Sequence, residues 1–253
     1  MKTKLITTLM LAMLTGAGHI LLAQQHDARE IVRKATDKLN GESSKGIMKM
    51  QIIRPTWTRE IEMKVWSLGT DYYMIYITAP AREEGQVFLK RSEDMWNYMP
   101  NINRMIKIPP SMMMQSWMGS DFTNNDLVKV SSMVDDYTHM IIGEDTLQGY
   151  DCRIIEFTPK PNAAVVWGKI EMWISKDELY ELKALYYNED GELVNKELMS
   201  EVEQMGDRKL PSHMEMIPVD KKGQKTVMDF IEMEFNVDIS EDFFSIQNMK
   251  RVR

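Results

Sequence analysis

Few residues in this chain have the type and spacing that catalysis or metal binding requires. Beyond the first 23 residues the histidines are His26, His139 and His213, and no two have the spacing of a metal-binding pair. With Cys152 as the one cysteine, zinc would have few ligands. The sequence also has no G-x-S-x-G elbow, P-loop or dinucleotide fingerprint. We therefore expect a protein without catalytic residues, cofactor or metal, in which Cys152 has a structural role.

Two acidic stretches are the remaining candidates for acid–base chemistry. They are Asp135-Asp136 and residues 188–190, and we interpret both as turns because short runs of Asp and Asn are typical of turns. Three tryptophans suggest either a sugar-binding platform or the wall of a core or cavity, and we favour the wall. These are Trp96, Trp117 and Trp167.

Methionine is the unusual residue type, with 24 in 253 residues. Its flexible, polarizable side chain fills irregular gaps and suits surfaces that accept varied apolar partners. Most of these methionines we interpret as ordinary core residues. The run Met112 to Met114, followed by Met118, is different, because three consecutive residues of a short helix cannot all face one core. Some of them should face a groove, a lid contact or a partner.

A helix is predicted shortly after the first 23 residues. Asp27 suits its N-cap, Glu30 follows three residues later, and Gly41 stands just past the end. Its apolar residues fall on one side, which must rest on an apolar surface. They are Ala28, Ile31, Val32, Ala35 and Leu39.

Alternating apolar and polar residues then predict strands with one dry face. Roughly ten such strands, with short turns such as Gln148-Gly149 between them, favour an antiparallel meander. In the last of them we place Val227, Ile231 and Met233 on the same face. Residues 192–204 fit a helix or a long strand. The fold class expected is mainly β, a strongly curved sheet or barrel. The alternating segments are Met48–Ile52, Ile61–Val65, Asp71–Thr78, Ile170–Ile174, Leu179–Tyr187, Met214–Met216 and Val227–Phe235.

One segment in the middle of the chain breaks this alternation. Pro109-Pro110 ends a strand, and the residues that follow, 111–118, read as a short helix or loop that Gly119 stops. Residues 123–126 have the pattern of a capping box for a second short helix. The methionine-rich middle is therefore expected to lie outside the sheet.

The first residues have the pattern of a secretory signal. Lys2 and Lys4 precede an apolar run over residues 5–14, and Ala23 offers a cleavage site. An uncleaved anchor is the alternative, although the run is shorter than a spanning helix needs. We expect a signal over residues 1–23, one domain over 24–253, and a periplasmic protein. The formal charge of −7 becomes −9 without the two lysines, which argues against nucleic acid or anionic membranes as partners.

Residues 95–127 resemble the outer membrane lipoprotein-sorting proteins of the LolA-like group. They read MWNYMPNINRMIKIPPSMMMQSWMGSDFTNNDL, and the MGSDF portion is the most specific part of the motif. The matching positions are Trp96, Tyr98, Pro100, Arg104, Ile108, Pro109, Ser111, Ser116, Met118, Gly119, Ser120, Asp121, Phe122, Asp126 and Leu127.

The resemblance implies an incomplete antiparallel β-barrel with short helices packed across its concave side and an apolar cavity between them. It implies a monomeric periplasmic carrier that binds lipid or lipoprotein acyl chains for transfer toward the outer membrane, with an inner-membrane transporter as a partner. The alternative functions are a sensor or escort module that binds a membrane protein, and an enzyme acting on lipid or glycan. The residues expected to form the lining and lid are Ile31, Ala35, Met74, Tyr76, Trp96, Tyr98, Met112, Met113, Trp117, Met118 and Phe122.

Overall fold

The computed structural model of the protein describes residues 27–128, 132–161, 163 and 165–253. The expected signal over residues 1–23 lies outside these ranges. Within them, no helix has the length and apolar character needed to cross a membrane.

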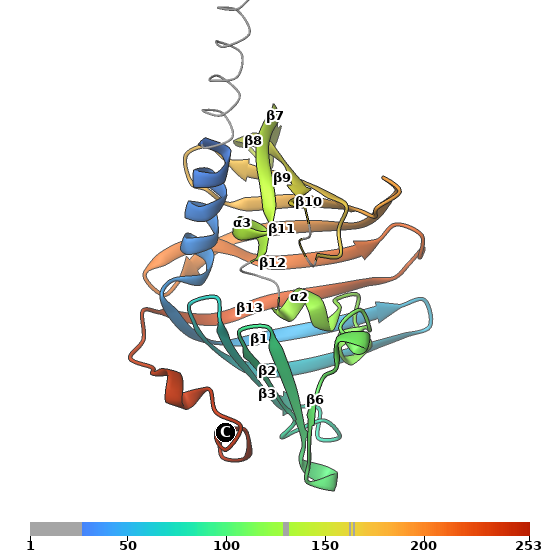
Figure 1. Cartoon of the computed structure of the whole chain (residues 1–253), viewed down its shortest axis with the longest axis vertical. Coiled ribbons are helices and arrows are strands. Elements are labelled where there is room, and N and C mark those ends of the chain that lie inside the picture. Colours follow the sequence, from blue (N-terminus) through green and yellow to red (C-terminus); the bar gives the residue numbers. More distant parts are fainter. Residues whose placement is uncertain (1–26, 129–131, 162, 164) are drawn as a thin grey trace, which may run out of the picture.

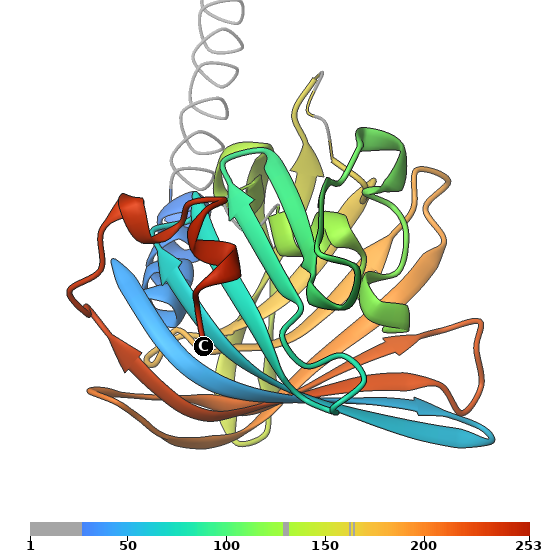
Figure 2. The ribbon, with the colours of Figure 1, turned by 90° about the horizontal axis from the view of Figure 1, so that it is seen from below.

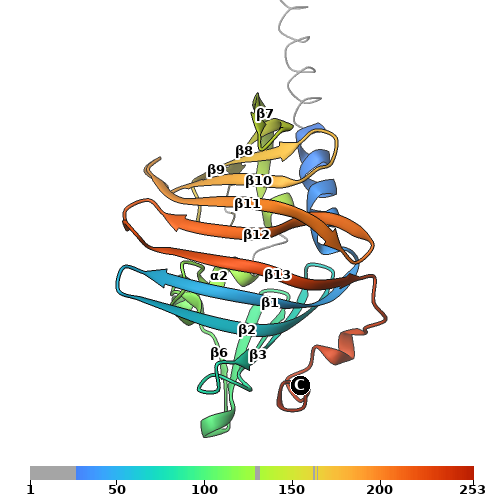
Figure 3. The ribbon, with the colours of Figure 1, turned by 180° about the vertical axis from the view of Figure 1, so that it is seen from behind.

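A single antiparallel sheet forms the body of the molecule (Figures 1 and 3). Its 13 strands run in the order β6-β5-β4-β3-β2-β1-β13-β12-β11-β10-β9-β8-β7, so β6 and β7 are the edges and the sheet is not closed. The predicted fold class, a strongly curved sheet or incomplete barrel, is confirmed. The strands are β1 (Ser43–Arg54), β2 (Trp57–Leu68), β3 (Tyr72–Ala79), β4 (Val87–Arg91), β5 (Asp94–Met99), β6 (Arg104–Lys107), β7 (Tyr137–Leu147), β8 (Tyr150–Pro159), β9 (Lys169–Ser175), β10 (Glu181–Tyr187), β11 (Leu193–Met205), β12 (Arg208–Pro218) and β13 (Lys225–Phe235).

The estimate of ten strands was too low, because some strands lack alternation. In β4 the first four residues, Val87 to Lys90, are all buried, and the strand sequence VFLKR does not alternate between apolar and polar residues. The segment that fitted either a helix or a strand is the long strand β11.

The face assigned to Ile231 in β13 is wrong. The register between β1 and β13 shifts there: Ile47 pairs with Glu232 and Met48 with Phe230, which leaves Ile231 as a bulge. Ile231 is 52% exposed, whereas Met233 packs against the core. The bulge thus changes which residues of β13 face inward.

Short helices lie on the concave side of the sheet (Figure 2). The N-terminal helix, residues 27–40, buries the face that the sequence predicts, with Ala28, Val32 and Ala35 at 1% exposure or less. It ends at Gly41, which has a φ of +66°. The other short elements are α2 (Asn124–Val128), α3 (Ser132–Asp135) and the 3-10 turns η1 (Pro100–Ile102), η2 (Pro110–Met112), η3 (Trp117–Gly119), η4 (Glu241–Phe243) and η5 (Asn248–Lys250).

The C-terminal segment covers the opposite, outer face of β3, β4 and β5. Phe244 and Met249, both fully buried, pack there against Met74 and Leu89. This contact makes the outer face of these strands apolar, and it accounts for the apolar character of both faces of β3.

Candidate functional site

A cavity of about 320 Å³ lies between the concave face of the sheet and the elements that cover it. Strands β1 to β4 and β9 to β13 provide the floor, while the end of the N-terminal helix, α2, α3 and residues 165–167 provide the cover. The volume is at the lower end of the range that small-ligand pockets occupy.

Methionine is the most frequent residue type in the wall of this cavity. The side chains are supplied mainly by the floor strands, and aromatic rings from Tyr73, Trp167, Tyr186 and Phe230 lie among them. Such a lining is apolar and can repack around ligands of different shape. The methionines are Met48, Met133, Met172, Met205, Met214, Met216, Met228 and Met233.

Three carboxyl groups interrupt the apolar wall. Glu181 on β10, Glu197 on β11 and Asp126 on α2 all line the cavity. Burial raises the pKa of Glu181 to about 7, with a further contribution from the charge of Glu197. Burial also raises the pKa of Glu197 to about 7, aided by the charge of Asp126 and opposed by a hydrogen bond from Tyr186. The pKa of Asp126 is raised, again chiefly by burial.

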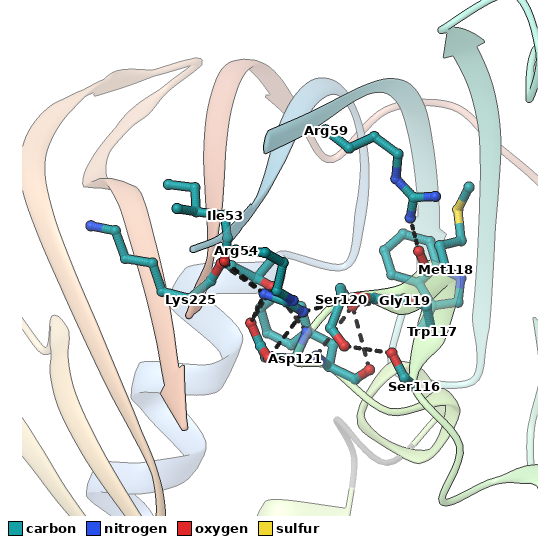
Figure 4. Close-up of polar contacts among 12 residues, drawn as sticks. Ile53, Arg54, Arg59, Ser116, Trp117, Met118, Gly119, Ser120, Asp121 and Lys225 are labelled. Carbon is teal, nitrogen blue, oxygen red and sulfur yellow. Dashed lines mark hydrogen bonds and ion pairs between the residues drawn. The ribbon is translucent and has the colours of Figure 1, made fainter. Parts of the chain in front are cut away.

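An ion pair fastens the MGSDF motif to the sheet (Figure 4). The Arg54 guanidinium donates to both carboxylate oxygens of Asp121, at 3.0 and 3.1 Å, and to the carbonyl oxygen of Gly119 at 3.0 Å. Thr226 of β13 adds a hydroxyl donated to Asp121 Oδ2 at 2.7 Å, and it accepts the Asp121 backbone N–H at 2.9 Å. The Arg54 and Asp121 side chains are only 12% and 5% exposed. Asp121 therefore joins the motif to the ends of β1 and β13.

Further contacts hold the residues just before Asp121. Arg59 of β2 donates to the Met118 carbonyl, and the Trp117 ring packs edge-on against Phe88 with centroids 5.5 Å apart. Ser120 donates its hydroxyl to the Trp117 carbonyl at 2.7 Å. Gly119 has a φ of +77°, a conformation that favours glycine and lets the chain turn toward Arg54.

The predicted capping box at the start of α2 is confirmed. The Thr123 backbone N–H donates to Asp126 Oδ2 at 2.7 Å, and the Asp126 N–H donates to Thr123 Oγ1 at 3.2 Å. Because α2 begins directly after the anchored motif, the Arg54–Asp121 pair also sets the position of this part of the cavity cover.

The residues expected to form the lining are only partly brought together. Phe122 lines the cavity. Met113, Trp117 and Met118 pack in or against the core cluster beside it, and Met112 is 36% exposed. Ile31 and Ala35 belong to the core under the N-terminal helix rather than to the cavity wall.

Four expected lining residues lie on the wrong face of the sheet. They belong to the cluster under the C-terminal segment, on the outer side, whereas Tyr73 of β3 and Lys90 of the neighbouring strand β4 line the cavity. Strand alternation requires this separation once the inward residues are known. The four are Met74, Tyr76, Trp96 and Tyr98.

The residues considered for catalysis occupy structural positions. Cys152 is fully buried, and the His139 ring nitrogen Nε2 lies 2.8 Å from the Met133 carbonyl oxygen. His213 hydrogen-bonds Asp229 at 2.7 Å. Residues 188–191 form the turn between β10 and β11. Among the described residues, no group of three or more His, Cys, Asp or Glu side chains is placed to hold a metal ion.

Solved structures share this fold over nearly their whole length. A DUF1329 family protein from Desulfovibrio piger matches with a TM-score of 0.81 and 26% identity, over 89% of this chain and 99% of that one. A domain described as an outer membrane lipoprotein-sorting protein, from Vibrio parahaemolyticus, gives a TM-score of 0.78 and 22% identity over 90% and 100%. A LolA superfamily protein from Nitrosomonas europaea gives 0.74 and 21% over 87% and 98%.

A family model described as an uncharacterized protein matches residues 69–251. The chain belongs to this family and has the LolA-like fold. The resemblance seen at the MGSDF motif is thereby confirmed for the LolA-like fold. No curated protein sequence matches the chain.

The motif residues fall on two parts of the fold. Residues Trp96 to Pro109 run through the edge strands, and Ser116 to Asp126 return across the concave side as the anchored segment and α2. Sequence reasoning missed Glu181, Glu197 and most of the methionines of β12 and β13 as cavity residues. Alternation places Met214 and Met216 of β12 on a common face, whereas in β13 the bulge at Ile231 is needed to bring Met228 and Met233 to the same side. The curvature of the sheet then directs that side toward the cover.

Proposed function

We propose that this protein is a periplasmic carrier that binds lipid or lipoprotein acyl chains in its methionine-rich cavity and performs no catalytic step. The observation that carries the proposal is the largely apolar cavity between the sheet and its helical cover. The sorting-protein domain from Vibrio parahaemolyticus has the same fold, which supports it. The signal-like sequence of residues 1–23 supports a periplasmic location, and we propose that the carrier acts as a monomer beside an inner-membrane transporter.

Transfer energetics explain why such a cavity is useful. Burying one methylene group away from water is worth about 0.8 kcal/mol, so a chain of about fourteen methylenes contributes roughly 11 kcal/mol. A lipid leaves a membrane for water only if most of this free energy is recovered. The methionine and aromatic wall offers an apolar environment that adapts to the chain.

Lipid extraction provides the direct test. The protein is purified from the periplasm without detergent, extracted with organic solvent and analysed by mass spectrometry. We expect a co-purifying lipid or acylated species. Repeated absence of any such species, together with no uptake of a fluorescent fatty acid or neutral apolar probe, would rule out the carrier function.

Filling the cavity should block binding. Met214→Trp replaces a flexible side chain in the floor of the cavity by a larger, rigid ring. Met214 pairs there with Met199 and Met228. We expect at least a tenfold loss of affinity for the neutral fluorescent probe N-phenyl-1-naphthylamine, because the ring occupies the volume that the probe needs. Fluorescence titration measures the affinity, and circular dichroism verifies the fold.

Met140→Trp is the matched control, since Met140 lies on β7 and is 39% exposed. It should bind the probe as the wild type does. Equal binding by the Met214→Trp and Met140→Trp variants would show that the probe does not occupy the cavity.

A module that binds another protein is the second candidate. It is favoured by the exposure of Met112 and Met114, at 36% and 54%, in the loop before the motif. Photocrosslinking from position 114 in cells distinguishes the two: a carrier gives lipid adducts or none, whereas a protein-binding module gives one reproducible protein adduct.

A further inference from the structure

The acidic residues of the cavity are concentrated on one part of its wall. Glu181 and Glu197 come from the neighbouring strands β10 and β11, and Asp126 faces them from α2. The cross-strand neighbours of Glu197 are Ala184 and Met216, so apolar side chains surround the carboxyl group. Carboxyl groups in such surroundings are unfavourable unless a partner satisfies them.

The three carboxyl groups differ in their partners. Asp126 accepts hydrogen bonds from Thr123 as part of the capping box, at 2.7 and 2.9 Å. Glu197 accepts the Tyr186 hydroxyl at 2.9 Å. Within the described residues, the Glu181 carboxyl group makes no hydrogen bond or ion pair, and the charge of Glu197 acts on its pKa. Glu181 is therefore an acceptor at the cavity wall that a ligand can satisfy.

Positive charge is scarce around this cavity. Lys90 on β4 is the basic residue on its wall within the described part of the chain, and its ammonium group donates to the Thr70 carbonyl. Lys90 is separated from β11 by five strands in the sheet order. A carboxylate or phosphate placed beside the two glutamates would meet like charges, whereas a cation would meet acceptors.

We propose that Glu181 and Glu197 bind the ammonium group of a long-chain amphiphile, so that the preferred ligand is a lipid-like amine and not a fatty acid. The inference rests on the proposed carrier function, because the apolar chain must occupy the cavity. An ammonium group supplies three donors, enough to engage Glu181 and the free oxygen of Glu197 together. The groups facing the pair are Asp126 and Tyr186, and neither supplies a competing cation.

Competition among three ligands with the same chain tests the preference. N-phenyl-1-naphthylamine is bound first, and it is then displaced at about pH 7.5 by tetradecylamine, tetradecanol or tetradecanoate, each below its micelle-forming concentration. Because charge-assisted hydrogen bonds are the stronger ones, we expect the amine to displace the probe at a concentration roughly tenfold or more below that of the carboxylate. The alcohol should fall between them.

The double variant Glu181→Gln/Glu197→Gln should lose the preference for the amine, since the amides keep the shape of the side chains without their charge. Glu203→Gln is the matched control, because Glu203 lies on the same strand, β11, but is exposed. It should keep the preference. Binding of the neutral probe to each variant reports whether the cavity is intact.

The outcomes separate the two proposals. Binding of the probe with equal displacement by amine and carboxylate, or by amine and alcohol, overturns the amine preference while the carrier function stands. A preference that survives in the double Gln variant overturns the role of Glu181 and Glu197. Failure of the wild type to bind the probe or any of the three ligands overturns the carrier function itself, and with it this inference.

Discussion

Replacing Asp121 by alanine should lower the free energy of unfolding by about 3–5 kcal/mol, because it leaves the guanidinium of Arg54 buried without its partner. The pair is bidentate and almost completely removed from solvent, and Thr226 loses its acceptor at the same time. Urea denaturation followed by tryptophan fluorescence measures the change. The same variant should weaken ligand binding, since α2 follows the anchored motif directly.

An exposed ion pair serves as the control for Asp121→Ala. Arg91→Ala removes a bridge to Glu241 in which the two side chains are 37% and 57% exposed, and we expect a loss below about 1 kcal/mol. The double variant Arg54→Ala/Asp121→Ala should be less destabilised than the sum of the two single variants. If Asp121→Ala costs no more than Arg91→Ala, the motif is not held by this pair.

The double variant Glu181→Gln/Glu197→Gln should be more stable than the wild type above neutral pH. The folded pKa of each glutamate is about 7, against 4.5 for the unfolded chain. Their contribution to stability is therefore fully present below pH 4.5 and is lost as the pH rises through 7. On the order of 2 kcal/mol per site should be recovered by the amides at alkaline pH.

The measurement is the difference in unfolding free energy between variant and wild type from about pH 4 to 8, by urea denaturation. This difference cancels the effect of His213, whose pKa is raised by Asp229 and Glu215 against the effect of burial and which also loses stability as pH rises. Glu203→Gln should show no such trend. A difference that stays constant across the pH range would contradict burial of the two carboxyl groups.

Local sequence patterns were sufficient to predict the elements that bury one face and expose the other. The N-terminal helix, its glycine stop and the capping box at Thr123 each depend on residues close together in sequence, and all three are confirmed. Alternation alone predicted a curved sheet or a barrel. The resemblance at the MGSDF motif added that the barrel is incomplete and that short helices cover its concave side. The Arg54–Asp121 contact that holds the motif was not predictable, because the two residues are 67 positions apart.

Face assignment failed where both sides of a strand are covered. Met74, Tyr76, Trp96 and Tyr98 are apolar because the C-terminal segment packs on them, and the sequence cannot tell this cover from the cavity. The face assigned to Ile231 was wrong for another reason, because a bulge changes the alternation within strand β13. Glu181 and Glu197 were missed because charged residues in a strand ordinarily indicate a solvent face.

The open sheet has a further consequence for contacts between copies of the chain. An unclosed sheet presents two edges whose free backbone groups can recruit a strand from another molecule. One edge, β6, has only four residues and carries Arg104 and Lys107 at its ends. The other edge, β7, is interrupted by a bulge between Ile141 and Gly143. A short charged edge and a bulged edge both discourage pairing with the sheet edge of another molecule, so an open sheet of this kind is compatible with separate copies of the chain.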